Sequence, residues 1–208
     1  YKRQIHALAI IKMSCAKTNQ KQKLLSPKIA SAIIDSAKQV YLGKYDEHFP
    51  LSVWQTGSGT QTNMNVNEVI ANIANRKISK KLGTNSPVHP NDHVNKSQST
   101  NDSFPSAINI ASKLKILSEL VPALKSMEKV LKSQSQKWKA IIKIGRTHLQ
   151  DATPLSLGQE FSGYQAQINS NIRRVEGSLT NLSYLAQGGT AVGTCLLYTS
   201  PSPRDGTK

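Results

Sequence analysis

The stretch AINIASKLKILSELVPALKSMEKVL, residues 107–131, decides the fold class of this chain. Its apolar residues recur in alternating steps of three and four, a spacing close to 3.5 residues that is typical of bundle helices. Only Glu128 interrupts this spacing, and Pro122 is expected to kink or restart the helix because proline has no N–H to donate. The apolar seam comprises Ile110, Leu114, Leu117, Val121, Leu124 and Leu131. The stretch therefore predicts a long bundle helix.

A second apolar seam occupies residues 161–185 and predicts a second long helix, which Gly188 and Gly189 are expected to end. Its members are Phe161, Tyr164, Ile168, Ile172, Val175, Leu179, Leu182 and Leu185. The two helices, joined near residues 145–154, indicate the start of an elongated helical bundle. Neither seam can be covered by the other alone, so we expect partner helices from further sequence or from other subunits.

Shorter helices are predicted ahead of the bundle. The first covers residues 5–16, and the second begins at Ser26-Pro27, a good capping pair, and ends near Leu42 because Gly43 supplies a left-handed stop. A third is expected within residues 63–83, with Gly83 at its end.

The chain is therefore expected to be all-α, a mainly helical N-terminal domain followed by the start of an elongated bundle. We expect the domain in residues 1–98, the first part of the bundle in 99–194, and a non-native tail in 195–208, which lacks apolar periodicity.

Composition narrows the function classes. The 208 residues carry 27 Lys and Arg against 12 Asp and Glu, a formal charge of +15 that raises the question of nucleic acid. However, eight Lys and two Glu spread over residues 113–143 along a helical pattern whose single aromatic residue is Trp138, which favours a solvated helix face over a base-stacking surface. A non-catalytic, basic, helical nucleic-acid-binding protein stays open as the alternative from a different class.

Neither a membrane segment nor a cysteine-based site is indicated by the sequence. Lys12 interrupts the apolar run near the N-terminus, and we expect a buried helix there rather than a signal peptide. No stretch approaches the ~18 apolar residues of a membrane helix. Cys15 and Cys195 lie far apart and outside any Cys-x-x-Cys motif, so no zinc cage is expected.

Three polar stretches are expected where helices begin or end, and we interpret them as anion-binding loops. They are TGSGTQTNMN (residues 56–65), VHPNDHVNKSQSTND (88–102) and GRTHLQDATP (145–154). Hydroxyl, carboxamide and backbone N–H groups at helix N-termini suit a carboxylate, because the helix dipole favours negative charge there.

These three stretches, together with GGTAVGT (residues 188–194), closely resemble class II fumarate hydratases of the fumarase/aspartase superfamily. The motifs occur in collinear order over roughly residues 5–194. His148 favours fumarase, since aspartases have Gln at that position, and argininosuccinate lyases lack the context of residues 54–57. Another lyase of the superfamily, of the aspartase or argininosuccinate lyase type, remains the nearest alternative.

The resemblance implies reversible hydration of fumarate to malate through an aci-carboxylate intermediate. His148 is implied as the catalytic acid/base that handles the water, and its imidazole suits proton transfer at neutral pH. The implied substrate-binding residues are Ser58, Gly59, Thr60, Asn63, Ser99, Thr100, Asn101 and Thr147. Residues 99–101 would also cap a helix whatever the function.

His89 and His93 stand four residues apart, a metal-ligand spacing on a helix, but Pro90 makes a loop the better interpretation. The resemblance implies instead a second dianion site formed by His89, Pro90, Asn91 and Asp92. Asn85 and Ser86 stand where the family often has Lys or Arg, a departure from the family pattern at this second site.

The resemblance also implies a homotetramer with a small dicarboxylate substrate, no cofactor, no metal, no nucleic acid and no membrane partner, in the cytoplasm or the mitochondrion. Family segments with a Gly-Ser-Ser loop, which carries a catalytic Ser, and with Lys-Val-Asn are not found in these residues. We therefore expect this segment by itself to be inactive.

Overall fold

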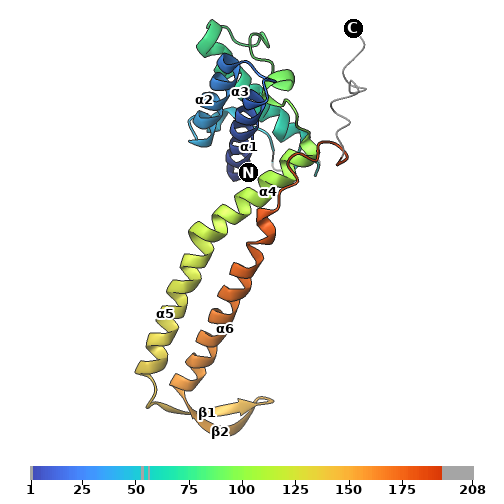
Figure 1. Cartoon of the computed structure of the whole chain (residues 1–208). Coiled ribbons are helices and arrows are strands. Elements are labelled where there is room, and N and C mark those ends of the chain that lie inside the picture. The colour runs from blue at the N-terminus through green and yellow to red at the C-terminus, as the bar shows by residue number, and fades with distance from the viewer. Residues whose placement is uncertain (1, 53, 56, 194–208) are drawn as a thin grey trace. The chain divides into compact units, whose positions relative to one another are not determined.

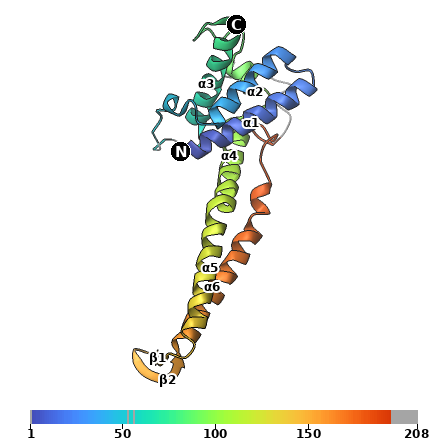
Figure 2. The same cartoon turned by 90° about the vertical axis from the view of Figure 1, so that its left-hand side faces the viewer.

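The computed structural model describes residues 2–52, 54–55 and 57–193, so the predicted tail at 195–208 lies outside the described residues. They form two compact units (Figures 1 and 2), the first within Tyr1–Ala111 and Tyr184–Lys208 and the second Ser112–Ser183. Helices predominate, which confirms the all-α prediction, although the segment expected only to join the long helices forms a two-stranded hairpin.

In the first unit, α1 (Lys2–Lys21), α2 (Pro27–Tyr41) and α3 (Thr60–Ser79) pack around one apolar core. The core stripe of α2 follows helical spacing and consists of Ala30, Ile33, Ala37 and Val40, all fully buried. Ser26 Oγ accepts a hydrogen bond from Ile29 N (3.4 Å), and Gly43 has φ +74°, which confirms both predicted ends of α2. Short turns η1 (Asp46–His48) and η2 (Pro90–Val94) complete this part.

The third helix ends earlier than expected. Helix α3 stops at Ser79 with Lys80 in the left-handed region at φ +58°, so the prediction of an end at Gly83 is wrong. The chain instead folds back over the last turns of the helix, where Asn72 Oδ1 accepts a hydrogen bond from Gly83 N (2.8 Å). The backbone N–H of Gly83 is therefore satisfied by the side chain of Asn72, and Gly83 does not form the end of the helix.

Helix α4 (Thr100–Lys115) begins in the first unit, and after a π-helical turn, η3 (Ile116–Leu120), α5 (Val121–Lys137) follows in the second unit. Pro122 lies in the first turn of α5, directly after the π-helical turn, so the hydrogen-bond pattern of the helix changes at the residue that has no N–H to donate. This placement confirms the predicted restart at Pro122. Glu128, the residue that breaks the seam, accepts a hydrogen bond from Gln165 Nε2 (2.6 Å) on α6.

Helix α6 (Leu157–Ser178) runs beside α5 (Figure 1) and is shorter than predicted. It ends ten residues before Gly188, so the prediction that the glycine pair ends it is wrong. Ser178 Oγ donates to Val175 O (2.7 Å) in the last turn, a side-chain bond that competes with continuation of the helix. The 3-10 turn η4 (Asn181–Ser183) follows.

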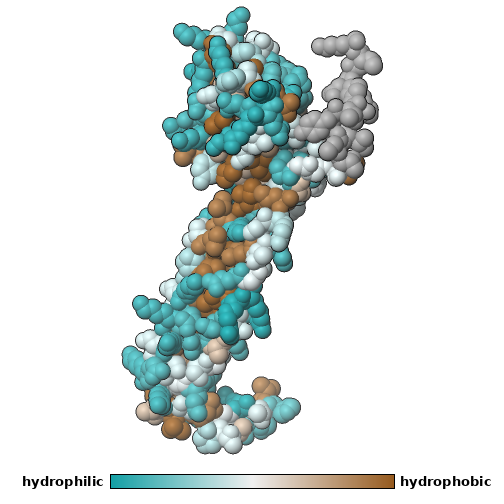
Figure 3. All heavy atoms as spheres, in the orientation of Figure 1, coloured by the Kyte–Doolittle hydropathy of each residue, from teal (hydrophilic) through white to brown (hydrophobic). Residues whose placement is uncertain are grey.

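The hairpin at the other end of α5 and α6 consists of antiparallel strands β1 (Ile142–Thr147) and β2 (Gln150–Ser156). A capping box at Ser156 and Gln159 joins it to α6. The second unit also exposes large apolar side chains along its helices, among them Leu117 (49% exposed) and Val130 (56%). Figure 3 shows brown, apolar surface along the long helices. Such a surface fits the expected partner helices.

Candidate active site

The loop before α3 carries the first group of predicted binding residues. Gly59 precedes the helix with φ +70°, a conformation that a side chain would strain, and a Cβ there would overlap the ring of Phe104 on α4. Ser58 Oγ and Thr60 Oγ1 lie 3.3 Å apart on either side of it. The glycine thus brings two hydroxyls close to the start of α4.

Asn63 links the first turn of α3 to the first residue of α4. Its fully buried Nδ2 donates to Thr100 Oγ1 (3.0 Å) and to Asn95 Oδ1 (3.4 Å). Its Oδ1 is buried as well and has no hydrogen-bond partner among the described residues. The structure therefore brings together Asn63 and Thr100, which lie 37 positions apart in sequence.

Ser99 and Asp102 form a reciprocal cap at the start of α4. Ser99 Oγ accepts from Asn101 N (3.2 Å), and Asp102 Oδ1 accepts from Ser99 N (3.0 Å). Such a cap satisfies N–H groups at a helix N-terminus. The capping interpretation of residues 99–101 is confirmed, and it leaves the exposed Asn101 side chain to donate to Ala191 O (3.1 Å).

Asp102 was not among the predicted site residues, yet it anchors a distant glycine-rich segment. Its Oδ2 accepts from Gly188 N (3.0 Å) and Thr190 N (2.9 Å), although only 1% of the residue is exposed. The segment GGTAVG, residues 188–193, is therefore held against the start of α4. A buried carboxylate is stable there because four donors surround it.

Lys12 is a second residue that the site prediction omitted. It lies on the apolar stripe of α1, is fully buried, and donates from Nζ to Asn95 Oδ1 (2.8 Å) and Gln98 Oε1 (3.0 Å). Desolvation by burial lowers the pKa of Lys12 to about 7, against opposing contributions from Cys15 and Asp102. A single Lys within an apolar helical stripe was the available sequence signal.

Thr147 and His148 belong to the second unit, at the tip of the β hairpin. The pair Thr147 and Gln150 closes a two-residue loop in which His148 (φ +50°) and Leu149 (φ +63°) are both left-handed, the geometry of a type I′ turn. His148 is thus exposed at a β turn rather than at a helix start. Leu149 is 95% exposed beside it.

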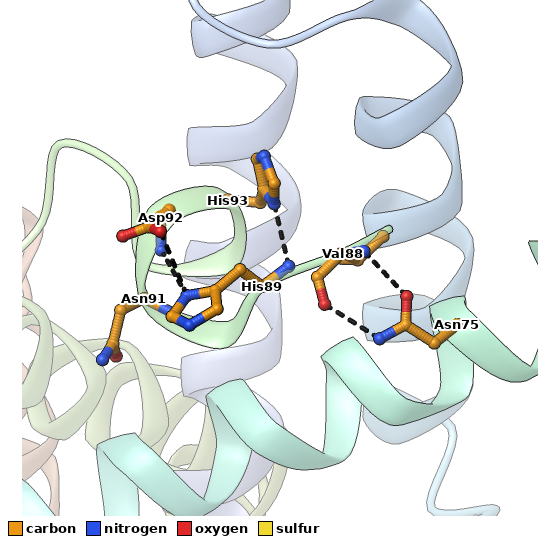
Figure 4. Close-up of polar contacts among 6 residues, drawn as sticks. All are labelled: Asn75, Val88, His89, Asn91, Asp92 and His93. Atoms are coloured by element: carbon orange, nitrogen blue, oxygen red, sulfur yellow. Dashed lines mark hydrogen bonds and ion pairs between the residues drawn. The ribbon is translucent and has the colours of Figure 1, made fainter. Parts of the chain in front are cut away.

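The second predicted group, residues 89–92, forms the start of the π-helical turn η2 rather than an open loop (Figure 4). His89 Nδ1 accepts from the backbone N–H groups of Asn91 and Asp92 (3.2 Å each), and Asp92 Oδ2 lies 3.4 Å from the same nitrogen. His93 Nδ1 accepts from His89 N (2.8 Å). Burial is the largest cause of the lowered pKa of His93.

A paired contact fixes the position of this turn. Asn75 on α3 exchanges two hydrogen bonds with the backbone of Val88, one from Asn75 Nδ2 to Val88 O (2.9 Å) and one from Val88 N to Asn75 Oδ1 (2.7 Å) (Figure 4).

In the described part of the chain, no cluster of three or more His, Cys, Asp or Glu side chains is arranged to hold a metal ion. The helices described here also include none with the length and apolar character needed to cross a bilayer.

Hydroxyl and carboxamide side chains thus gather at the starts of α3 and α4 of this helical frame. The family model described as "Lyase" matches residues 1–202, and the chain belongs to this family.

Three similar proteins refine this assignment. "Fumarate hydratase class II 2" of Bradyrhizobium diazoefficiens is 57% identical over 92% of this chain, and "Fumarate hydratase class II" of Caulobacter vibrioides is 56% identical over 92%. A crystal structure of class II fumarase from Schistosoma mansoni superposes with a TM-score of 0.90 at 45% identity, covering 93% of this chain and 40% of that one. The chain spans 41% and 42% of the two curated relatives, respectively.

Proposed function

We propose that the protein containing these residues catalyses the reversible hydration of fumarate to malate. The observation that carries the proposal is the hydrogen bond from Asn63 to Thr100 (3.0 Å), which joins the first turns of α3 and α4. Two helix N-termini and their hydroxyls thereby face one region, and helix N-termini favour anions such as a carboxylate. The similarity to class II fumarate hydratases supports the same substrate.

The roles of the side chains follow from the chemistry of hydration. Ser58, Thr60, Thr100 and Asn101 supply donors for a carboxylate, and Gly59 and Ser99 set the backbone on which they lie. Donors aimed at a carboxylate stabilise the extra charge that it gains as the aci-carboxylate forms. His148, with Thr147, is assigned to the added or departing water, whose oxygen must exchange a proton with an acid/base group.

Several wider features belong to the same proposal. Residues 89–92 form a second, weaker dianion site, the enzyme is a homotetramer that needs no cofactor, and it works in the cytoplasm or the mitochondrion. The exposed apolar side chains of the second unit support assembly. The division of the chain between residues 98 and 99 stays part of the proposal, although the two compact units of the structure divide between residues 111 and 112.

The test is a spectroscopic assay of fumarate consumption by the full-length natural protein that contains these residues. We expect malate as product, and His148→Asn to lower kcat by about 10²–10⁴-fold, the range of general acid–base catalysis. The matched control is His48→Asn, which changes another exposed histidine outside the site. Turnover of aspartate or argininosuccinate, without any of fumarate or malate, would replace the proposal by another lyase activity.

A second pair of variants tests substrate binding. Thr100→Val removes a hydroxyl and keeps the shape of the side chain, so kcat/KM is expected to fall by about tenfold or more, since a hydrogen bond to a charged group contributes about 1.5–3 kcal/mol. Thr180→Val makes the same change at an exposed position and should have no effect. Equal kinetics for the two variants would remove Thr100 from the site.

A further inference from the structure

Lys12 is connected to the proposed substrate site through Asn95 and Asn63, and the hydration chemistry assigns it no role. Its ammonium is fully buried and contacts two carboxamide oxygens, Asn95 Oδ1 at 2.8 Å and Gln98 Oε1 at 3.0 Å. Among the described residues no carboxylate lies within ion-pair distance of its Nζ. Burying an amine without an ionic partner costs free energy of folding. Such a cost points to a function for Lys12 other than stabilising the fold.

The contacts of Lys12 fix the direction of a chain of hydrogen bonds. A lysine that donates to Asn95 Oδ1 makes that oxygen an acceptor, and the Asn95 amide nitrogen then donates to Gln98 O (3.3 Å). Asn63 can approach Asn95 Oδ1 only through its own Nδ2 (3.4 Å), and the same Nδ2 donates to Thr100 Oγ1 (3.0 Å). With its oxygen accepting from Asn63, the Thr100 hydroxyl keeps its hydrogen for another acceptor.

The direction of this chain does not depend on the charge of Lys12. Burial lowers the pKa of Lys12 to about 7, so both forms are present near neutral pH. A neutral amine keeps two N–H groups, enough for the two carboxamide oxygens. Both forms therefore present a donor to Asn95.

We propose that Lys12 is a positioning residue for the dicarboxylate site: through Asn95 and Asn63 it orients the Thr100 hydroxyl to donate its hydrogen to a substrate carboxylate. This inference rests on the proposed function. Asn95 and Asn63 lie between Lys12 and Thr100 in this chain of contacts, so Lys12 itself contacts no reacting atom. The unpaired, buried Asn63 Oδ1 is the consequence of an amide that is held with its nitrogen toward Thr100.

The experiment compares Lys12→Met with wild type in the full-length natural protein. Methionine fills a similar space and removes every donor. We expect KM for malate to rise about tenfold, the change expected when a hydrogen bond to a charged group is lost, while kcat falls by less. Lys17→Met, on the exposed face of the same helix, is the matched control for loss of a positive charge and should leave KM unchanged.

Two further measurements separate positioning from support of the fold. Addition of ethylamine to Lys12→Ala should restore KM by returning an amine to the vacated space, which a purely structural role does not predict. A crystal structure of Lys12→Met should show the Asn63 amide displaced from Thr100. An unchanged KM in a folded Lys12→Met protein, with the Asn63 to Thr100 contact intact, overturns the proposal.

Failure of the proposed function gives a different pattern. A wild-type protein that turns over neither fumarate nor malate refutes the hydratase assignment. In that case the crystal structure of Lys12→Met still decides whether Lys12 orients Asn63 and Thr100.

Discussion

The Asp102 carboxylate accepts a hydrogen bond from the backbone N–H of Thr190 at 2.9 Å, across 88 positions of sequence. The same carboxylate caps the start of α4 through Ser99 N. One buried side chain thus fixes both the segment that supplies Ser99, Thr100 and Asn101 and the glycine-rich segment that lies against it. Its geometry makes Asp102 a structural support of the proposed site.

Asp102→Asn is expected to lower the free energy of unfolding by about 3 kcal/mol, because its amide group turns a donor toward N–H groups that need an acceptor. Chemical denaturation of the variant and of wild type measures the difference. Asp35→Asn, on the exposed face of α2, is the control and should change stability by less than about 0.5 kcal/mol. Similar small changes in both variants would show that the contacts of Asp102 contribute little.

Gly59→Ala is expected to cost about 2–4 kcal/mol of stability, since it adds left-handed strain at φ +70° to overlap with the Phe104 ring. Gly83→Ala separates the two contributions, because Gly83 has the same φ but open space around a Cβ, and about 1 kcal/mol is expected there. Thermal denaturation of both variants supplies the comparison. Equal losses would mean that the loop moves away from Phe104 at no cost.

Leu149→Gly is expected to stabilise the protein by about 1 kcal/mol, because glycine adopts φ +63° without the clash that a Cβ makes. The control is Leu82→Gly, at another exposed leucine that has no positive φ, where no gain is expected. Melting temperatures of the two variants distinguish the effects. A marked loss at Leu149 would show that its exposed side chain packs against a partner in the assembled protein.

Lys12 should make stability rise with pH between about 7 and 9. Its pKa is about 7 when folded and returns to the ordinary 10.5 on unfolding, so the unfolded chain binds more protons in this window. The cost of keeping Lys12 buried is therefore largest below pH 7 and falls as pH rises, by about 2 kcal/mol over the window. The raised pKa of Cys15, about 11, acts in the opposite direction from about pH 8 upward, where the thiol of the unfolded chain begins to ionise around its ordinary value of 9.0, and it offsets a small part of the gain.

Denaturation at several pH values, with wild type and Lys12→Met measured side by side, isolates this contribution. The stability difference between them should shift in favour of wild type from pH 7 to pH 9. Lys17→Met removes an exposed amine, and its stability should depend on pH as that of wild type does. Parallel curves for wild type and Lys12→Met would show that Lys12 titrates near its ordinary pKa.

Local rules account for much of the fold. The ends of α2 at Ser26 and Gly43 and the restart of the bundle helix at Pro122 follow from caps, left-handed stops and the missing proline N–H. The predicted end of α3 at Gly83 was wrong because the Asn72 side chain, from within the helix, accepts the hydrogen bond of the Gly83 N–H. The hairpin was not predicted because its strands are held by hydrogen bonds between residues on either side of a turn. A search for helical spacing does not detect such pairing.

The helical class, the polar loops and the family resemblance could be predicted from the sequence, because spacing, capping residues and motifs are local properties of the chain. The tertiary packing was needed to show that Asn63 contacts Thr100 and that the buried groups of Lys12 and Asp102 support the loops around them. A buried polar group must find its partners wherever the fold places them, and these lie up to 88 positions away.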